Sequence, residues 1–188
     1  MKPLRLVLIT RRYWPLVGGA ETAMANLARE LSTQGHEVFL LTARWESEWP
    51  EEIRHAGARV IRLAQPRQRF WGTWRYMQGI RRWLANNRDD FDVVYASMLK
   101  HDAYAALGVG AKLGFPVIAR AEGAGATGDA HWQQKNPFGS QIRRRCREAR
   151  AIVAPSQEIE RELLQAGYEE SQVVRISNGT PTLDELPS

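Results

Sequence analysis

The chain has 188 residues, 44% of them hydrophobic, and carries 26 Lys+Arg against 21 Asp+Glu for a net charge of +5. This predicts one globular domain with a full core, and the modest charge favours phosphate-bearing ligands, anionic membranes or nucleic acid without choosing among them. The single cysteine, Cys146, excludes an internal disulfide framework and a cysteine metal site, and no run approaches ~18 apolar residues, so we expect a cytosolic protein that is neither secreted nor membrane-spanning.

Apolar runs and helical periodicities alternate along the whole chain. The predicted strands are residues 5–10, 37–43, 58–63, 91–97, 115–121, 151–154 and 173–176. Most are separated by stretches with helical spacing of apolar residues, whereas 46–57 is polar and is expected to form a loop. This alternation predicts the α/β class: a doubly wound, mostly parallel, Rossmann-like sheet of six or seven strands with helices on both faces.

Two glycines, Gly18 and Gly19, end a long loop after the first predicted strand and begin the first helix. Glycine lets the backbone turn sharply and approach a ligand, and the free N–H groups at a helix start attract anions. We expect a glycine at the N-cap and Glu21 at the positive end of the helix dipole. The pair indicates either a phosphate-binding loop or a plain strand-to-helix turn.

Two common nucleotide sites are not indicated at this loop. A dinucleotide fingerprint would follow the first strand directly and would place an acidic residue after the second strand. Here seven residues precede the glycines, and the second strand runs into Arg44. No Gly-Lys-Ser/Thr follows, which also argues against a nucleoside triphosphatase.

Three loops are expected at the carboxyl edge of the sheet, where open α/β sheets bind ligands. They are the loop with the two glycines, residues 97–101, and a glycine-rich stretch from Glu122 to Trp132. Arg120 and Glu122 are two residues apart, so their side chains should leave the same face of a strand end. The glycine-rich stretch could close on a ligand.

The most unusual composition lies between residues 65 and 87, which are rich in arginine and tryptophan. On a helical wheel, one face is expected to pack on the sheet. Its residues are Phe70, Trp74, Met77, Ile80 and Leu84. Another face carries Trp71, Arg75 and Arg82, and indicates either an interfacial membrane contact or a solvated face with one aromatic. No nucleic-acid-binding motif accompanies it, so nucleic acid is not an expected partner.

Over essentially its whole length, the chain resembles the N-terminal half of a glycosyltransferase of the retaining family 4, which has the two-domain GT-B architecture. The opening that carries the resemblance is Tyr13-Trp14-Pro15-Leu-Val-Gly18-Gly19-Ala-Glu21, with Leu27-Ala-Arg-Glu-Leu31 and Gly35-His-Glu-Val38. The close is Ala154-Pro155-Ser156 followed by Ile176-Ser177-Asn178-Gly179. Ser177 stands where the family usually has proline, and Thr180-Pro181 replaces its usual Val-Asp, two departures that concern the hinge.

The resemblance implies an acceptor-side domain at 1–180, the start of an interdomain linker at 181–188, and an absent C-terminal donor-binding domain. A nucleotide-diphosphate sugar would be the donor, and this domain alone would bind no cofactor or metal. The implied partners are the chain's own C-terminal domain and a sugar or lipid-linked acceptor, to which the Arg/Trp helix adds an anionic membrane surface as an expected partner. The implied setting is cell-envelope glycan biosynthesis in the cytoplasm or at the inner membrane face. Without the C-terminal domain, the cleft would lack the positively charged groups that hold the leaving diphosphate, and it would admit water. The chain is therefore expected to be inactive alone.

The resemblance also implies roles for particular residues. Glu122 stands where the family has histidine and is the expected catalytic residue, although an ionised carboxylate accepts but cannot donate hydrogen bonds. Gly18 and Gly19 would lie over the donor diphosphate and the acceptor. The expected acceptor-binding residues are Tyr13, Trp14, His101, Arg120, Asp129 and His131. For Tyr13 and Trp14, packing within the loop is an equal alternative.

Two rival functions remain open at this point. One is a sugar-nucleotide epimerase of the same two-domain fold. The other is a non-catalytic module that binds a membrane or polyanion through the Arg/Trp helix.

Overall fold

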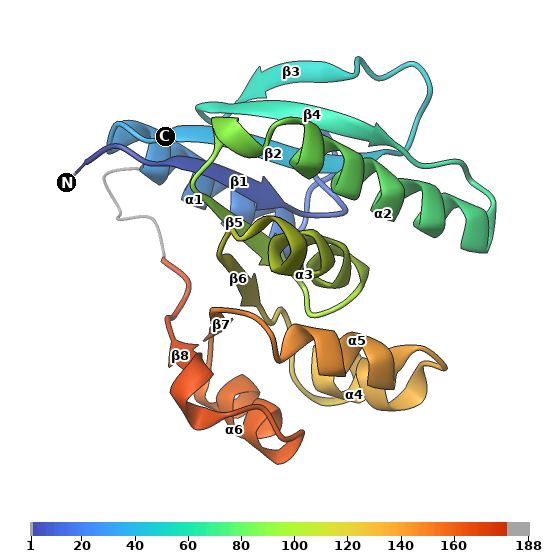
Figure 1. Cartoon of the computed structure of the whole chain (residues 1–188), viewed down its shortest axis with the longest axis vertical. Coiled ribbons are helices and arrows are strands. Elements are labelled where there is room, and N and C mark those ends of the chain that lie inside the picture. Colours follow the sequence, from blue (N-terminus) through green and yellow to red (C-terminus); the bar gives the residue numbers. More distant parts are fainter. Residues whose placement is uncertain (1, 180–188) are drawn as a thin grey trace.

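A computed structural model describes residues 2–179 and has an eight-stranded sheet at its centre, in the order β3-β4-β2-β1-β5-β6-β7-β8 (Figure 1). The strands are β1 (Arg5–Ile9), β2 (Glu37–Arg44), β3 (Glu52–His55), β4 (Ala58–Ala64), β5 (Val93–Ser97), β6 (Val117–Arg120), β7 (Ala151–Ala154) and β8 (Val173–Arg175). All neighbours pair in parallel except β3 and β4. The predicted α/β class and mostly parallel sheet are confirmed, and the predicted linker 181–188 lies outside the described residues.

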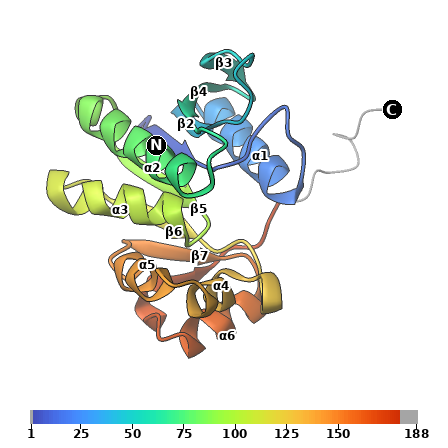
Figure 2. The same cartoon turned by 90° about the vertical axis from the view of Figure 1, so that its right-hand side faces the viewer.

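Helices cover the two faces of this sheet unequally. They are α1 (Gly19–Thr33), α2 (Arg69–Asn86), α3 (His101–Leu113), α4 (Asp129–Lys135), α5 (Gly139–Cys146) and α6 (Gln157–Gln165), with single 3₁₀ turns at η1 (Arg88–Asp90), η2 (Gly125–Thr127) and η3 (Glu170–Gln172). Met24 and Ala28 of α1 pack on Leu8 and Leu40, whereas the larger cluster on the opposite face joins α2, α3, α5 and α6 (Figure 2). Among the helices of residues 2–179, α1 alone lies on its face of the sheet.

The eighth strand, β3, falls in the stretch expected to be a loop. Its sequence is Glu-Ile-Arg-His, and only Ile53 contributes an apolar side chain, to the α1 face. A strand at the edge of a sheet needs no continuous apolar run, so the composition gives no strand signal. Ala56 and Gly57 both have positive φ and close the β3–β4 hairpin, as two-residue hairpin turns require.

The buried face of α2 differs from the predicted one at the start of the helix. Tyr76, Ile80 and Leu84 are fully buried, but Phe70 and Trp74 are exposed, so the predicted face is wrong there. An 18-residue helix is about 27 Å long, more than the strands can cover. The start of α2 extends past the end of β4 (Figure 1), where no sheet lies beneath it.

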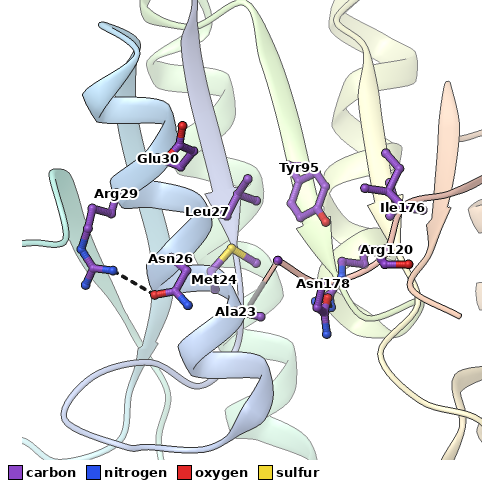
Figure 3. Close-up of a pocket in the computed structure, with 13 residues that line it drawn as sticks. Ala23, Met24, Asn26, Leu27, Arg29, Glu30, Tyr95, Arg120, Ile176 and Asn178 are labelled. Carbon is purple, nitrogen blue, oxygen red and sulfur yellow. Dashed lines mark hydrogen bonds between the residues drawn. The ribbon is translucent and has the colours of Figure 1, made fainter. Parts of the chain in front are cut away.

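Part of the sheet has a helix on one face only. On the α1 face, Tyr95 of β5 and Ile118 of β6 are half-buried, because no described helix covers β5 to β7 there. A groove of about 670 Å³ runs over this area between α1 and the segment after β8 (Figure 3). Parallel strands usually have both faces covered, which marks this face as incomplete within the described part of the chain. No helix in residues 2–179 combines the length and apolarity needed to cross a bilayer.

Two glycines offer a matched test of this packing. A Cβ at Gly139 would lie 1.8 Å from the carbonyl oxygen of Gln133, whereas a Cβ at Gly108 in α3 meets nothing within 4 Å. We expect Gly139→Ala to lower the free energy of unfolding by about 2–3 kcal/mol through overpacking, and Gly108→Ala to raise it by about 0.5–1 kcal/mol through helix propensity. Urea unfolding of both variants measures this, and equal effects would contradict the close approach of α4 and α5.

Candidate functional site

Four side chains from three strand ends form one hydrogen-bonded network at the carboxyl edge. Oε1 of Glu122 accepts from Ser97 Oγ at 2.5 Å and from Arg120 Nη1. Arg120 Nη2 donates to Oδ1 of Asn178 at 2.6 Å. The side chains of Arg120 and Glu122 are only 7% and 10% exposed. Ser97 and Arg120 end adjacent parallel strands in register, which is why they meet.

Asp129 supports this network from the start of α4. Its Oδ2 accepts the backbone N–H of Glu122 at 2.7 Å, and its Oδ1 lies 3.6 Å from Lys100 Nζ. Asp129 is buried, so in this structure it holds the Glu122 loop in place and does not face solvent. His131, two residues on, lines a separate cavity of about 190 Å³ with Gly125 and Glu162. The structure therefore does not bring His131 together with Arg120.

Burial and charge act in opposite directions on the two carboxyls. The pKa of Glu122 is raised above its ordinary value, because the effect of burial exceeds the lowering by the Arg120 guanidinium and the Ser97 hydroxyl. Burial also raises the pKa of Asp129, against hydrogen bonding at the Glu122 amide and the charge of Lys100. Among the described residues no hydrogen bond reaches Oε2 of Glu122, so this oxygen can accept a bond from a ligand.

The glycine pair begins α1 as expected, with Gly18 as the N-cap. A Cβ on Gly19 would meet open space, so its backbone is accessible. The Glu21 carboxylate, however, lies against Gly18 and forms an ion pair with Arg12 at 3.1 Å. An anion approaching this helix start would meet both a carboxylate and a guanidinium, which weakens the attraction of the bare helix dipole.

Tyr13 and Trp14 pack against the β3–β4 hairpin. Tyr13 is 1% exposed, and its hydroxyl lies 3.1 Å from Nδ1 of His55. Trp14 stacks on the His55 ring, with centroids 5.2 Å apart, and its carbonyl accepts from buried Arg62. Loop packing, the alternative considered from sequence, is thus what Tyr13 does in this structure, while half of Trp14 stays open to solvent.

Beside the network lie two neighbouring polar residues, the partly buried His101, which was an expected acceptor-binding residue, and the buried Asp102, which was not. The His101 ring packs edge-on against Trp132, and burial with nearby Arg11 and Lys100 lowers the pKa of His101 to about 4. Asp102 is fully buried, and burial raises its pKa to about 7 despite Arg11 and Tyr76. Its Oδ1 finds no hydrogen-bond partner in residues 2–179.

The residues predicted to contact a membrane lie along the exposed side of α2. Trp71 stacks on Trp74, and the Arg75 guanidinium lies 6.0 Å from the Trp71 ring centroid. Arg82 is exposed about two turns further along the helix. Within the described part of the chain, no group of three or more His, Cys, Asp or Glu side chains is arranged to hold a metal ion.

The site thus contains residues that sequence reasoning missed. Ser97 and Lys100 fall in a loop assigned to the carboxyl edge, and strand order alone would have suggested their involvement. Asn178 is 58 residues from Arg120, and its turn-like sequence gives no indication of that contact. Figure 3 shows Arg120 and Asn178 side by side at one end of the groove, with Tyr95 further along its floor.

A family model described as Glycosyltransferase Family 4 matches residues 17–182. A search of curated proteins finds no match. Among solved structures, sucrose-phosphate synthase from Thermosynechococcus elongatus is similar, with 17% identity, a TM-score of 0.66, and coverage of 94% of this chain and 48% of that one.

Two further solved structures show the same likeness. Anabaena HepE in complex with UDP-glucose has 12% identity and a TM-score of 0.68, with coverage of 94% and 44%. UDP-N-acetylglucosamine 2-epimerase from Rickettsia bellii has 10% identity and a TM-score of 0.61, with coverage of 94% and 45%. At these identities the likeness shows the Rossmann-like fold of GT-B proteins, and the chain spans about half the length of each.

Asp102 makes the stability depend on pH. In the unfolded chain its pKa is near its ordinary value of about 3.9, below the value in the folded state, so the folded state holds the extra proton between these two values. Stability is therefore lost as pH rises through this window. Asp102→Asn mimics the protonated form, and we expect it to be up to about 4 kcal/mol more stable than the native chain at pH 8, with the gap closing near pH 4. Urea unfolding across this range measures the gap, and a gap independent of pH would contradict the assignment.

Proposed function

This chain belongs to Glycosyltransferase Family 4, and we propose that it is the acceptor-side half of a retaining glycosyltransferase. In this proposal the enzyme transfers a sugar from a nucleotide-sugar donor to a glycan or lipid-linked acceptor in cell-envelope glycan biosynthesis at the cytoplasmic side, and this half is inactive alone. The observation that carries the proposal is the network that holds Glu122 between Ser97, Arg120 and Asn178 at the carboxyl edge.

Glu122 is the residue proposed to contact the acceptor. In the transfer, the bond from the anomeric carbon to the donor phosphate oxygen breaks, a bond to the acceptor oxygen forms, and the proton of the acceptor hydroxyl passes to the leaving diphosphate. The free Oε2 of Glu122 can accept the hydrogen bond of that hydroxyl and so orient its oxygen. Arg120 opposes the effect of burial and favours the ionised carboxylate that this role needs.

The surroundings of Gly18 and Gly19 support the view that this half lacks a complete diphosphate site. The accessible Gly19 backbone can approach a phosphate, but Glu21 sits against Gly18 and Arg12 is engaged with it. One paired guanidinium cannot neutralise a diphosphate leaving group. The main cationic clamp would come from a second lobe.

The open sheet face and the segment after β8 support a second lobe in the same polypeptide. Tyr95 lies on the floor of the uncovered groove, and Arg120 fixes Asn178 at its end. The solved structures that this chain resembles are about twice its length. A lobe attached after Asn178 would start from a position set by the Glu122 network.

An epimerase is the second candidate, favoured by the likeness to a UDP-N-acetylglucosamine 2-epimerase of the same fold. It differs in needing no acceptor. Product analysis of the longer polypeptide with UDP-N-acetylglucosamine alone separates the two: an epimerised nucleotide sugar would favour the epimerase and overturn the transferase.

The half-enzyme proposal predicts no turnover by residues 1–188. We expect no sugar transfer from a panel of nucleotide sugars to added glycan or lipid-extract acceptors, because the diphosphate clamp is incomplete and water enters the cleft. Radiolabel transfer or mass spectrometry measures this. Robust turnover by this chain would show that it needs no second lobe.

The role of Glu122 predicts a large loss in the longer enzyme. Glu122→Gln keeps the shape but removes the charge, and we expect kcat to fall about 10²-fold or more, with a smaller change in KM. Glu158→Gln, at an exposed position on α6, is the matched control. If the Glu122→Gln enzyme has the same urea unfolding midpoint and the same kcat as the native enzyme, Glu122 does not orient the acceptor.

A further inference from the structure

Exposed aromatic side chains cluster on the first turns of α2. Phe70 is 78% exposed, Trp71 49% and Trp74 43%. The two indole rings stack at 4.8 Å with 17° between their planes, and Arg75 lies over Trp71. We call Phe70, Trp71, Trp74 and Arg75 the α2 aromatic patch. Exposed apolar residues are normally scattered singly, so a grouped patch indicates a surface that meets an apolar or interfacial partner.

The charged residues of α2 and of the chain segment around it are all arginines. Residues 65–88 contain no aspartate or glutamate but six arginines. Arg75 and Arg82 are exposed on α2, whereas Arg67, just before the helix, is paired with Glu46. Tryptophan and arginine together suit the boundary of a bilayer, where the ring enters the interface and the guanidinium meets lipid phosphates. The patch is thus complementary to an anionic lipid surface.

The patch is connected to the loop that opens the candidate site. Arg11, from the loop after β1, donates to Thr73 Oγ1 at 2.8 Å and to Gln65 Oε1 at 3.1 Å. Because α2 starts beyond the end of β4, its first turns lie toward the carboxyl edge from which Glu122 emerges (Figures 1 and 2). A surface that contacts the patch therefore lies at the carboxyl-edge end of α2 (Figure 1).

We propose that the α2 aromatic patch docks this domain on an anionic lipid bilayer. The three rings enter the interfacial layer and Arg75 meets lipid phosphates. This patch differs from the membrane-contacting face predicted from the sequence. Phe70 and Trp74 were predicted to lie in the core, whereas in the structure they form part of the apolar surface of the patch. If the proposed transferase function holds, docking brings this domain to the bilayer that carries a lipid-linked acceptor; the docking itself does not depend on that function.

Vesicle binding by the 188-residue chain tests the proposal. We expect co-sedimentation with equimolar phosphatidylglycerol–phosphatidylcholine vesicles, little with phosphatidylcholine alone, and a blue shift of tryptophan fluorescence on binding. Trp71→Ser/Trp74→Ser should weaken binding by about tenfold or more through lost apolar burial. Arg75→Glu/Arg82→Glu should weaken it by at least about fivefold per arginine, and added salt should weaken the native chain.

Phe138→Ser is the matched control, because Phe138 is also exposed but precedes α5 and lies outside the patch. It should bind as the native chain does. Urea unfolding checks that each variant is folded. The proposal is overturned if the native chain does not bind anionic vesicles, if Phe138→Ser loses as much binding as the tryptophan variant, or if heparin binds the chain while vesicles do not. None of these outcomes bears on turnover, so docking and transferase function fail separately.

Discussion

The buried guanidinium of Arg120 is the constraint on which the rest of the site depends. A buried charge is tolerated only when it is paired and hydrogen-bonded. Arg120 meets this condition with two partners, the Glu122 carboxylate and the Asn178 amide oxygen. The same contacts fix the loop after β6 and the segment after β8 relative to each other. The position of the candidate catalytic carboxylate is thus set by burial, and Glu122 keeps one oxygen available for a ligand.

Within the described residues, the carboxyl edge forms only part of a ligand site. One face of β5 to β7 has no helix in the described chain. At the Gly18–Gly19 bend, the Glu21 carboxylate lies against Gly18 and forms an ion pair with the Arg12 guanidinium. An orienting carboxylate is in place, but a concentrated positive charge for a diphosphate is not. The proposed division of labour follows: this half positions the acceptor, and another lobe stabilises the leaving group.

Sequence reasoning found what depends on local pattern. Apolar runs gave the parallel strands, the glycine pair gave the start of α1, and the spacing of Arg120 and Glu122 placed them on one face. It could not find partners set by strand order and register. Ser97 meets Glu122 because β5 and β6 are neighbours, and Asn178 meets Arg120 across 58 residues. Helical periodicity likewise gave α2 but not its overhang, so Phe70 and Trp74 were assigned to a core that does not reach them.

We infer that ligands meet this domain at the edge held by Arg120, and backbone amide shifts of the ¹⁵N-labelled chain during titration with a panel of nucleotide sugars measure where they bind. The account predicts weak, millimolar binding with shifts grouped at Gly19, Glu122 and Asn178. Shifts confined to the cavity at His131 or to the far end of the groove, or no shifts with any of these nucleotide sugars at millimolar concentration, would contradict it.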